Sequence, residues 1–451
     1  MVERPELGKR PSSNGKNVSP PPSKRRQQST TTSKAVANFF TPISKKEPEN
    51  MMWRIVRDSL LVGKFGAPTA SAQVAAKGKR RVAAFDFDST LVVSASGRKF
   101  GGDASDWKWW HSSVPGRLKD LHDEGYLIAI VSNQGGISLK PDPKTVKSDQ
   151  KRLADFKSKV GAVLNQLDIP ISVYAATRRD QYRKPRSGMW QELLDDYDLD
   201  HADLLDLETS FFVGDAGGRE AVPGGAVKDH SCADRDFAAN IGLPFHTPEE
   251  FFLHEEPRSF VRSFEPTIYL KERAEKPSPA STAFTKPDKP DIVLFCGSPG
   301  AGKSSFYWKH LQPLGYGRVN QDILKTREKC VQAATALIDE GTSVVVDNTN
   351  ADPDTRAVWI KLAQKLGLSI RCVLFTASAT VCEHNDTVRA LNIGPETNPE
   401  SRTILPKLAF TGFASRYRKP KLSEGFVDII MTDFEFEGSE EQRKLWSRYW
   451  T

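Results

Sequence analysis

Two aspartates and a threonine, Asp86, Asp88 and Thr90, stand at alternate positions directly after the apolar run RVAAF. If this run forms a strand, both carboxylates project to the same side at its carboxyl end, where the sites of α/β proteins lie. One carboxylate can then attack phosphorus, while the other protonates the leaving oxygen and later activates water. Polar strand ends also serve as caps and turns, so the pattern predicts phosphoryl chemistry only together with further residues.

Three more polar residues follow apolar segments or lie beside a proline further along the chain. Ser132 in VSN is suited to hydrogen-bond a phosphoryl oxygen, and Asp215 at the end of FFVGD is suited to a magnesium ion. Lys184 in RKPRSGMW offers a cation to the transferring group, although a lysine taken singly could be a surface residue. In this order, the segments predict a phosphatase site.

The ordered set resembles the haloacid-dehalogenase-like phosphatases over about residues 75–250. The resemblance implies that Asp86 is the nucleophile, which forms an aspartyl-phosphate, and that Asp88 is the general acid and base. It also implies that Thr90 and Ser132 bind the phosphate and that Lys184 stabilises charge. The implied ligands of Mg²⁺ are Asp86, the Asp88 backbone carbonyl and Asp215.

A second phosphate-handling motif, GSPGAGKSS at 297–305, follows the apolar run DIVLFC and matches G-x-x-x-x-G-K-[ST] in full. Its glycines allow backbone N–H groups to wrap the phosphates of a nucleotide, here ATP. Lys303 reaches the terminal phosphates, and the Ser304 hydroxyl can ligate Mg²⁺. The predicted nucleotide-binding residues are Gly297, Gly300, Gly302, Lys303, Ser304 and Ser305.

Three residues beyond the P-loop favour a kinase, each with a structural alternative. Asp322 in VNQD could take the proton from an attacking hydroxyl, or could cap the following helix. Asp347, after the run VVV, is a Walker-B-like carboxylate or a structural cap. Arg389 falls one turn after Asn385, as in a lid helix that brings an arginine over the phosphates, or it is an ordinary solvated arginine.

The elements that must position these residues form two series of apolar runs. The first series consists of the runs at 81–85, 127–133, 171–176 and 211–215. Because these runs alternate with helix-like segments such as 144–167, they predict a parallel sheet flanked by helices. A second series follows at 291–297, 342–348 and 369–375. We therefore predict an α/β protein with a disordered tail (1–50), a haloacid-dehalogenase-like domain (51–265), a linker (266–290) and a P-loop domain (291–451).

Charge and cysteine usage exclude some classes of protein. The first 50 residues hold ten basic and four acidic side chains, so they account for +6 of the net charge of +7. Bulk charge therefore gives no evidence for DNA binding by the folded part. The five cysteines include no C-x-x-C pair, which indicates reduced thiols and no zinc site. No apolar run is long enough to span a membrane.

The polar tail contains two candidate motifs. Basic clusters separated by a Pro-rich spacer at 9–26 are similar to a bipartite nuclear-import signal, or are a solvated basic tail. Val36, Phe39 and Phe40 have the spacing of a sliding-clamp-binding peptide, although Ser33 stands where that motif has glutamine; an accidental aromatic pair is the alternative. We expect a nuclear protein that is a monomer.

The order of the two sites, phosphatase before kinase, resembles the eukaryotic polynucleotide kinase 3′-phosphatase family over about residues 51–451. Local strings support this, including DWKWWH, KPRSGMW, VGDAGGR, GSPGAGKSS and VVDNTNADPDTR. The resemblance implies Mg²⁺-dependent hydrolysis of 3′-phosphate ends of DNA and ATP-dependent phosphorylation of 5′-hydroxyl ends. Such ends are then ready for a polymerase or a ligase.

Two departures from that family stand out. The N-terminal segment is too short and polar for the forkhead-associated domain of animal members, so recruitment through such a domain is not expected. Gln321 replaces the arginine that precedes the kinase aspartate in animal members, which puts a DNA-phosphate contact there in doubt.

Other interpretations remain open at the level of sequence. Both folds also serve small molecules, so a metabolite kinase and phosphatase is an alternative; a DNA-binding adaptor with decayed sites is another, although the motifs are intact. RNA ends are possible, because no pattern reports on a 2′-hydroxyl. The cluster Trp107, Trp109 and Trp110 could stack on bases or belong to the core, the commoner fate.

Overall fold

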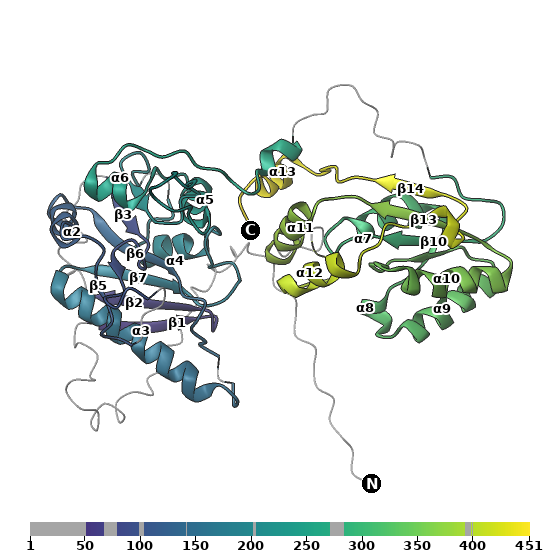
Figure 1. Ribbon diagram of the computed structural model, residues 1–451, viewed down its shortest axis with the longest axis horizontal. Coiled ribbons are helices and arrows are strands. Elements are labelled where there is room, and N and C mark those ends of the chain that lie inside the picture. Colours follow the sequence, from purple (N-terminus) through teal and green to yellow (C-terminus); the bar gives the residue numbers. More distant parts are fainter. Residues whose placement is uncertain are drawn as a thin grey trace, which may run out of the picture. The chain divides into compact units, whose positions relative to one another are not determined.

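The computed structural model describes residues 51–66, 79–98, 103–140, 142–201, 204–270, 284–392, 398 and 400–451. Two sheets with helices organise these residues, and both belong to the unit Glu47–Thr451 (Figure 1). The basic clusters at 9–26 and the motif with Val36, Phe39 and Phe40 lie outside the described residues. Nuclear import and clamp binding therefore stay predictions.

The first sheet has seven strands in the order β1-β2-β7-β6-β3-β8-β9. Four mutually parallel strands match the predicted apolar runs: β3 (Val82–Phe85), β6 (Leu127–Asn133), β7 (Ile171–Ala176) and β8 (Phe211–Val213). A fifth parallel strand, β9 (Phe245–His246), pairs with β8 and was not predicted. The hairpin of β1 (Met51–Val56) and β2 (Leu60–Phe65) adds an antiparallel edge on β7, which the sequence analysis did not predict. A short pair, β4 (Val92–Val93) with β5 (Lys108–Trp109), lies apart from this sheet.

Helices cover both faces of this sheet, because alternate residues of its strands enter two different cores. Ala83 and Phe85 of β3 join one core, and Val82 and Ala84 join the other. The first core includes α2 (Val114–Asp123), α3 (Val146–Leu167) and α6 (Pro248–Leu253); the second includes α4 (Gly188–Asp196) and α5 (Ala233–Ile241). Strands buried on both faces explain why the runs are continuously apolar.

The second sheet is wholly parallel, in the order β11-β12-β10-β13-β14. Its strands are β10 (Asp291–Cys296), β11 (Gly317–Val319), β12 (Val344–Val346), β13 (Ser369–Phe375) and β14 (Ile429–Thr432). One core uses α9 (Arg327–Asp339) and α10 (Pro353–Leu366); the other uses the π-helix η5 (Tyr307–Leu311), α11 (Ala379–Leu391) and α12 (Lys407–Arg416). Short helices include α7 (Lys303–Phe306), α8 (Gln321–Leu324), η7 (Leu422–Glu424) and α13 (Glu440–Trp446).

The tryptophan cluster belongs to the edge of the first core. Trp107, Trp109 and Trp110 are half-buried and pack against this core. The Trp109 indole also donates a hydrogen bond to Gln166 Oε1 over 3.1 Å. These contacts favour the core interpretation over base stacking.

Among the described residues, no helix is long and apolar enough to cross a membrane.

Arg356 of α10 generates a prediction about stability. Its buried guanidinium pairs with both oxygens of Glu424 over 2.8 Å and donates to the carbonyls of Asn350 and Ala351. Arg356→Met leaves these acceptors without their donor, so we expect a loss of about 3 kcal/mol in unfolding free energy. Urea denaturation measures it, and Lys151→Met, which removes an exposed pair, is the control at below about 0.5 kcal/mol. A loss below about 1 kcal/mol in unfolding free energy for Arg356→Met would contradict the view that this buried ion pair stabilises the fold.

Candidate active sites

The first site forms where three neighbouring parallel strands end. Asp86 follows β3, Ser132 and Asn133 end β6, and Asp215 lies two residues after β8. Because β6, β3 and β8 are adjacent in the sheet, their carboxyl ends bring these side chains to one edge. A hydrogen bond from the Asp86 backbone N–H to the Val213 carbonyl, 2.8 Å long, continues the pairing of β3 with β8.

Lys184 is the central cation of this site. Its ammonium group lies 2.7 Å from Asp86 Oδ1 and 2.7 Å from Asp234 Oδ1, and it donates to the Val131 carbonyl over 2.8 Å. Burial disfavours the charged lysine, but Asp234 and Asp86 together hold its pKa above the ordinary value. The side chain of Asn133 exchanges two hydrogen bonds with the Lys184 backbone, at 2.9 and 3.2 Å. Lys184 is therefore a buried, fixed group and no surface lysine.

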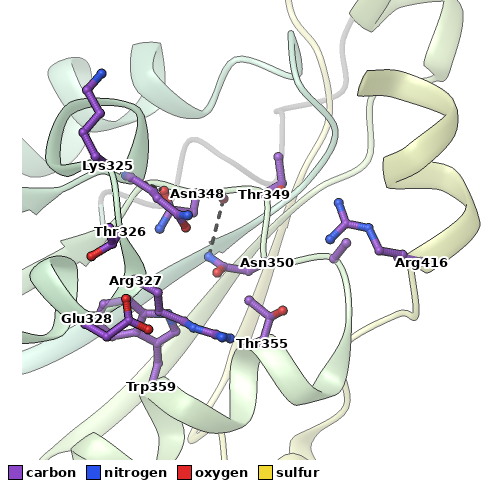
Figure 2. A pocket seen from close by; sticks show the side chains of 12 residues that line it. Lys325, Thr326, Arg327, Glu328, Asn348, Thr349, Asn350, Thr355, Trp359 and Arg416 are labelled. Atoms are coloured by element: carbon purple, nitrogen blue, oxygen red, sulfur yellow. Dashed lines mark hydrogen bonds between the residues drawn. The ribbon is translucent and has the colours of Figure 1, made fainter. Parts of the chain in front are cut away.

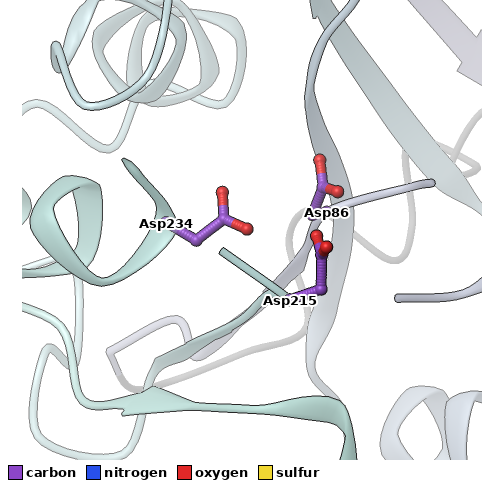
Figure 3. A group of neighbouring side chains, drawn as sticks. All are labelled: Asp86, Asp215 and Asp234. Carbon is purple, nitrogen blue, oxygen red and sulfur yellow. The ribbon is translucent and has the colours of Figure 1, made fainter. Parts of the chain in front are cut away.

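Asp86, Asp215 and Asp234 form an acidic cluster (Figure 3). One oxygen of each of the three carboxylates lies within 4.8 Å of the others. Burial, assisted by the neighbouring carboxylates, raises the pKa of Asp86 to about 6 against the pull of Lys184, and raises that of Asp215 to about 8. Such a surplus of buried carboxylates over cations is the chemistry of a divalent-metal site.

Asp234 is a site residue that the sequence analysis did not identify. It lies in the first turn of α5, where its Oδ1 contacts Lys184 and its Oδ2 accepts the Ala216 backbone N–H over 3.0 Å. Both of its oxygens are thus occupied by protein donors. The sequence shows an acidic residue at the start of the helical segment that follows FFVGD. It does not show that Lys184 is the partner of this residue, because that contact depends on the fold.

The remaining predicted residues of this site differ in their surroundings. The side chain of Asp88 is half exposed, and it accepts hydrogen bonds from Lys159 and Gln134. Ser132 is buried, and its hydroxyl accepts a hydrogen bond from Gln134 over 3.1 Å. Thr90 is fully buried, and its hydroxyl has no hydrogen-bond partner among the described residues. Its phosphate-binding role stays a prediction.

The second site is the loop between β10 and α7. Gly300 and Gly302 have φ values of +75° and +89°, and a Cβ on Gly300 would lie 2.1 Å from the Cys382 carbonyl oxygen. These positions therefore require glycine. Lys303 folds back over the loop and donates to the carbonyls of Gly297 and Ser298, at 3.0 and 2.6 Å. Burial lowers its pKa to about 8.

The P-loop serine contacts the carboxylate that follows β12. Ser304 donates to Asp347 Oδ2 over 2.9 Å, and the same oxygen lies 2.5 Å from the guanidinium of Arg318. Arg318 also pairs with Glu400 over 2.7 Å. Asp347 is therefore a Walker-B-like residue of the site, and the cap of the next helix is Asp352. Ser305 is exposed on α7.

The predicted base and the predicted lid arginine lie near this loop. Asp322 is exposed, with Arg402 at 3.4 Å, and the cap of α8 is Asn320 rather than Asp322. Asn385 of α11 donates to the Gly300 carbonyl over 3.0 Å, which fixes this helix against the P-loop. Arg389, one turn later, pairs with Asp386 at 2.5 Å. Its Nε is buried without a hydrogen-bond partner among the described residues.

Two cavities adjoin the kinase residues. One, of about 570 Å³, lies beside the predicted base and is lined mainly by polar and charged side chains, among them Gln321, Lys325, Arg327, Asn348 and Arg416 (Figure 2). The other, of about 260 Å³, is more apolar and adjoins the P-loop at Ser298; Phe375, Phe413 and Tyr417 contribute to its wall.

Comparison with known proteins gives consistent results for both halves. The family described as polynucleotide kinase 3 phosphatase matches residues 81–252, and an AAA domain family matches residues 292–411. A bifunctional polynucleotide phosphatase/kinase of Schizosaccharomyces pombe is 37% identical over 402 residues, which cover 89% of this chain and 88% of the relative.

Two further relatives match most of the chain and part of it, respectively. A mimivirus protein, whose name also describes a bifunctional polynucleotide phosphatase/kinase, is 30% identical over 82% of this chain and 88% of its own. A polynucleotide 3′-phosphatase of Saccharomyces cerevisiae is 26% identical and matches 38% of this chain and 87% of its own. The similarity thus extends over both predicted sites.

Lys184 generates a prediction about stability and pH. Lys184→Met leaves Asp86 and Asp234 buried without their cation, so we expect a loss of about 3 kcal/mol in unfolding free energy at pH 8. Burial raises the pKa of Asp86 to about 6 even with Lys184 in place, so protonation of Asp86 below pH 6 relieves the repulsion in the variant. The loss therefore becomes smaller at pH 5 than at pH 8.

Urea denaturation of the metal-free protein in EDTA at both pH values measures this difference. Lys228→Met, which removes an exposed pair with Glu220, is the control and should change stability by less than about 0.5 kcal/mol. A loss that is equal at pH 8 and pH 5 would contradict the charge argument.

Proposed function

Because this chain belongs to the bifunctional polynucleotide phosphatase/kinase family, we propose that its two sites act on opposite termini of a DNA break. The first site removes a 3′-phosphate through an aspartyl-phosphate, and the second phosphorylates a 5′-hydroxyl with ATP. The products suit gap filling and ligation in DNA repair. The observation that carries the proposal is the pairing of buried Asp86 with Lys184 at the sheet edge that also holds Asp215.

In the phosphatase reaction, Asp86 is the nucleophile. Lys184 binds its Oδ1, which leaves Oδ2 to attack phosphorus, form the new P–O bond and break the bond to the 3′-oxygen. Asp88 gives its proton to that leaving oxygen. Asp88 then takes a proton from the water that cleaves the aspartyl-phosphate, and inorganic phosphate leaves. Ser132 and Lys184 stabilise the charge on the phosphoryl oxygens.

The acidic cluster fits a Mg²⁺ ion. Both oxygens of Asp234 already have protein donors, so the residues that would hold the ion are Asp86, Asp215 and the Asp88 backbone carbonyl. A bound Mg²⁺ neutralises the phosphate and polarises its oxygens. Since the pKa of Asp215 is about 8 without metal, ion binding at neutral pH would also release a proton.

In the kinase reaction, the P-loop backbone and Lys303 hold the phosphates of ATP, which supplies the phosphoryl group. Ser304, in contact with Asp347, is the residue that would hold its Mg²⁺. The apolar cavity beside Ser298 suits the adenine ring, because the aromatic side chains of Phe375, Phe413 and Tyr417 form part of its wall. Asp322 accepts the proton of the 5′-hydroxyl as its oxygen bonds to the γ-phosphorus, and the P–O bond to ADP breaks, so that ADP leaves. Arg389 stabilises charge on the transferring group.

The acceptor strand fits the larger cavity. Gln321, the residue before Asp322, lines this cavity, and its charged lining residues are three cations and one carboxylate: Lys325, Arg327, Arg416 and Glu328. Cations at this position suit the phosphates that follow the 5′-hydroxyl. A small metabolite has no such backbone, so this feature favours a polynucleotide acceptor.

One duplex tests the whole proposal. It contains a gap with a 3′-phosphate and a 5′-hydroxyl, each strand labelled, and is incubated with the protein, Mg²⁺ and ATP. We expect conversion of both termini, with ATP required only for the 5′ change. Hydrolysis of small phosphate esters without any change in the duplex would favour a metabolite enzyme, and a matching RNA duplex distinguishes DNA from RNA ends.

Asp86→Asn should abolish the phosphatase activity and leave the kinase activity within about twofold of the wild type. The amide cannot attack phosphorus, whereas the kinase residues lie on the other sheet. End-labelled oligonucleotides with a single reactive terminus measure each activity separately. A loss of both activities in a folded variant would contradict two separate sites.

Lys303→Met should have the opposite effect, a loss of at least about 100-fold in 5′ phosphorylation with the phosphatase retained. The methionine keeps most of the apolar stem of the side chain but removes the cation that contacts the terminal phosphates. Single-turnover phosphorylation at saturating ATP measures the loss, with Lys151→Met as a control outside both sites. Unchanged phosphorylation would exclude Lys303 from the mechanism.

A further inference from the structure

Two side chains from different elements hold the half-exposed carboxylate of Asp88. Lys159 of α3 donates to its Oδ1 over 2.7 Å, and Gln134, just after β6, donates to its Oδ2 over 2.7 Å. Asp88 is 50% exposed and Lys159 only 17%. Both oxygens of the carboxylate thus have a defined donor, although the group itself faces solvent.

Packing fixes the position of Lys159. Its ammonium group lies 5.1 Å from the centre of the ring of Phe87, the residue between Asp86 and Asp88. The Phe87 ring is fully buried and makes an edge contact with Phe156 of the same helix, at 6.1 Å between centroids. The helix that carries Lys159 is therefore attached to the segment that carries Asp88, and the contact does not depend on charge attraction alone.

Gln134 connects the acid to the phosphate-binding end of β6. Its side-chain nitrogen donates to Asp88 and also to the Ser132 hydroxyl, over 3.1 Å. Its backbone N–H donates to the Ala176 carbonyl over 2.7 Å, so the residue is held by the adjoining strand. Gln134 consequently sets the distance between Asp88 and the hydroxyl that we assign to the phosphate.

Stability is a poor explanation for these contacts. An ion pair with a half-exposed partner typically contributes less than about 1 kcal/mol to folding. Orientation is a better explanation, because a solvent-facing aspartate otherwise populates several side-chain rotamers. General acid catalysis requires the acid within roughly 2.6–3.2 Å of the oxygen that takes the proton.

We propose that Lys159 and Gln134 are positioning residues that hold Asp88 in the orientation from which it protonates the leaving 3′-oxygen. This inference rests on the proposed role of Asp88 as the general acid. The alternative is that Lys159 contacts a phosphate of the DNA strand and has no effect on proton transfer. The two roles differ in how they depend on the leaving group.

The test compares two substrates with the full-length Lys159→Met variant. A 3′-phosphorylated oligonucleotide has an alkoxide leaving group that needs a proton, whereas p-nitrophenolate leaves without one. The rate of leaving-group release in the first turnover isolates this step from hydrolysis of the aspartyl-phosphate. We expect a decrease of about 10- to 100-fold for the oligonucleotide at saturation and less than about threefold for p-nitrophenyl phosphate.

Lys151→Met is the matched control, because it removes the same charge from the exposed surface of the same helix. It should leave both rates within about twofold of the wild type. Three results would overturn the inference. They are an equal loss on both substrates, unchanged rates on both, and a salt-dependent rise in KM for the oligonucleotide at unchanged saturating rate.

Asp88→Asn distinguishes failure of this inference from failure of the proposed function. If Asp88→Asn shows the selective loss and Lys159→Met does not, Asp88 is the acid and Lys159 does not position it. If Asp88→Asn affects both substrates equally in the first turnover, Asp88 is not the acid, and the inference fails with the proposed role.

Discussion

The buried ammonium group of Lys184 is the interaction on which the first site depends. A lysine and two carboxylates are costly to bury separately, and each is tolerated here because the others neutralise it. The arrangement requires β3 to deliver Asp86, α5 to deliver Asp234 and Asn133 to fix the backbone of Lys184. The surplus of carboxylates over cations at this edge supports the proposed Mg²⁺ site.

The P-loop holds its cation in a different way. Lys303 is as inaccessible as Lys184, but its hydrogen-bond partners are the carbonyls of Gly297 and Ser298. With no carboxylate to compensate burial fully, its pKa falls to about 8. Such a lysine gains from an anionic ligand, whereas Lys184 already has its counterions. The two lysines therefore differ in the charge of their partners: Lys184 is paired with carboxylates, whereas Lys303 contacts neutral carbonyls.

In both sites, the carboxylate that we propose for proton transfer lies at or near solvent. Asp88 and Asp322 are at least half exposed, in contrast to the buried Asp86 and Asp347. A carboxylate that exchanges a proton must be accessible to the substrate hydroxyl or to water. Interactions between charged groups are stronger in the low-dielectric interior. Exposed groups need orientation from neighbours, and Lys159 and Gln134 provide it for Asp88.

The apolar runs predicted the central parallel strands of both sheets and the order of the two sites. Apolar runs that end in polar residues are local signals, because a parallel strand buried on both faces must be apolar and must deliver its last residues to one edge. The runs at 127–133, 171–176 and 369–375 accordingly match β6, β7 and β13 residue for residue. Only the tertiary structure decided the partners, such as Asp234 for Lys184, Lys159 for Asp88 and Arg318 for Asp347. These pairs join residues that lie far apart in the chain. Their contacts depend on how helices and strands pack against one another, which the local sequence does not specify.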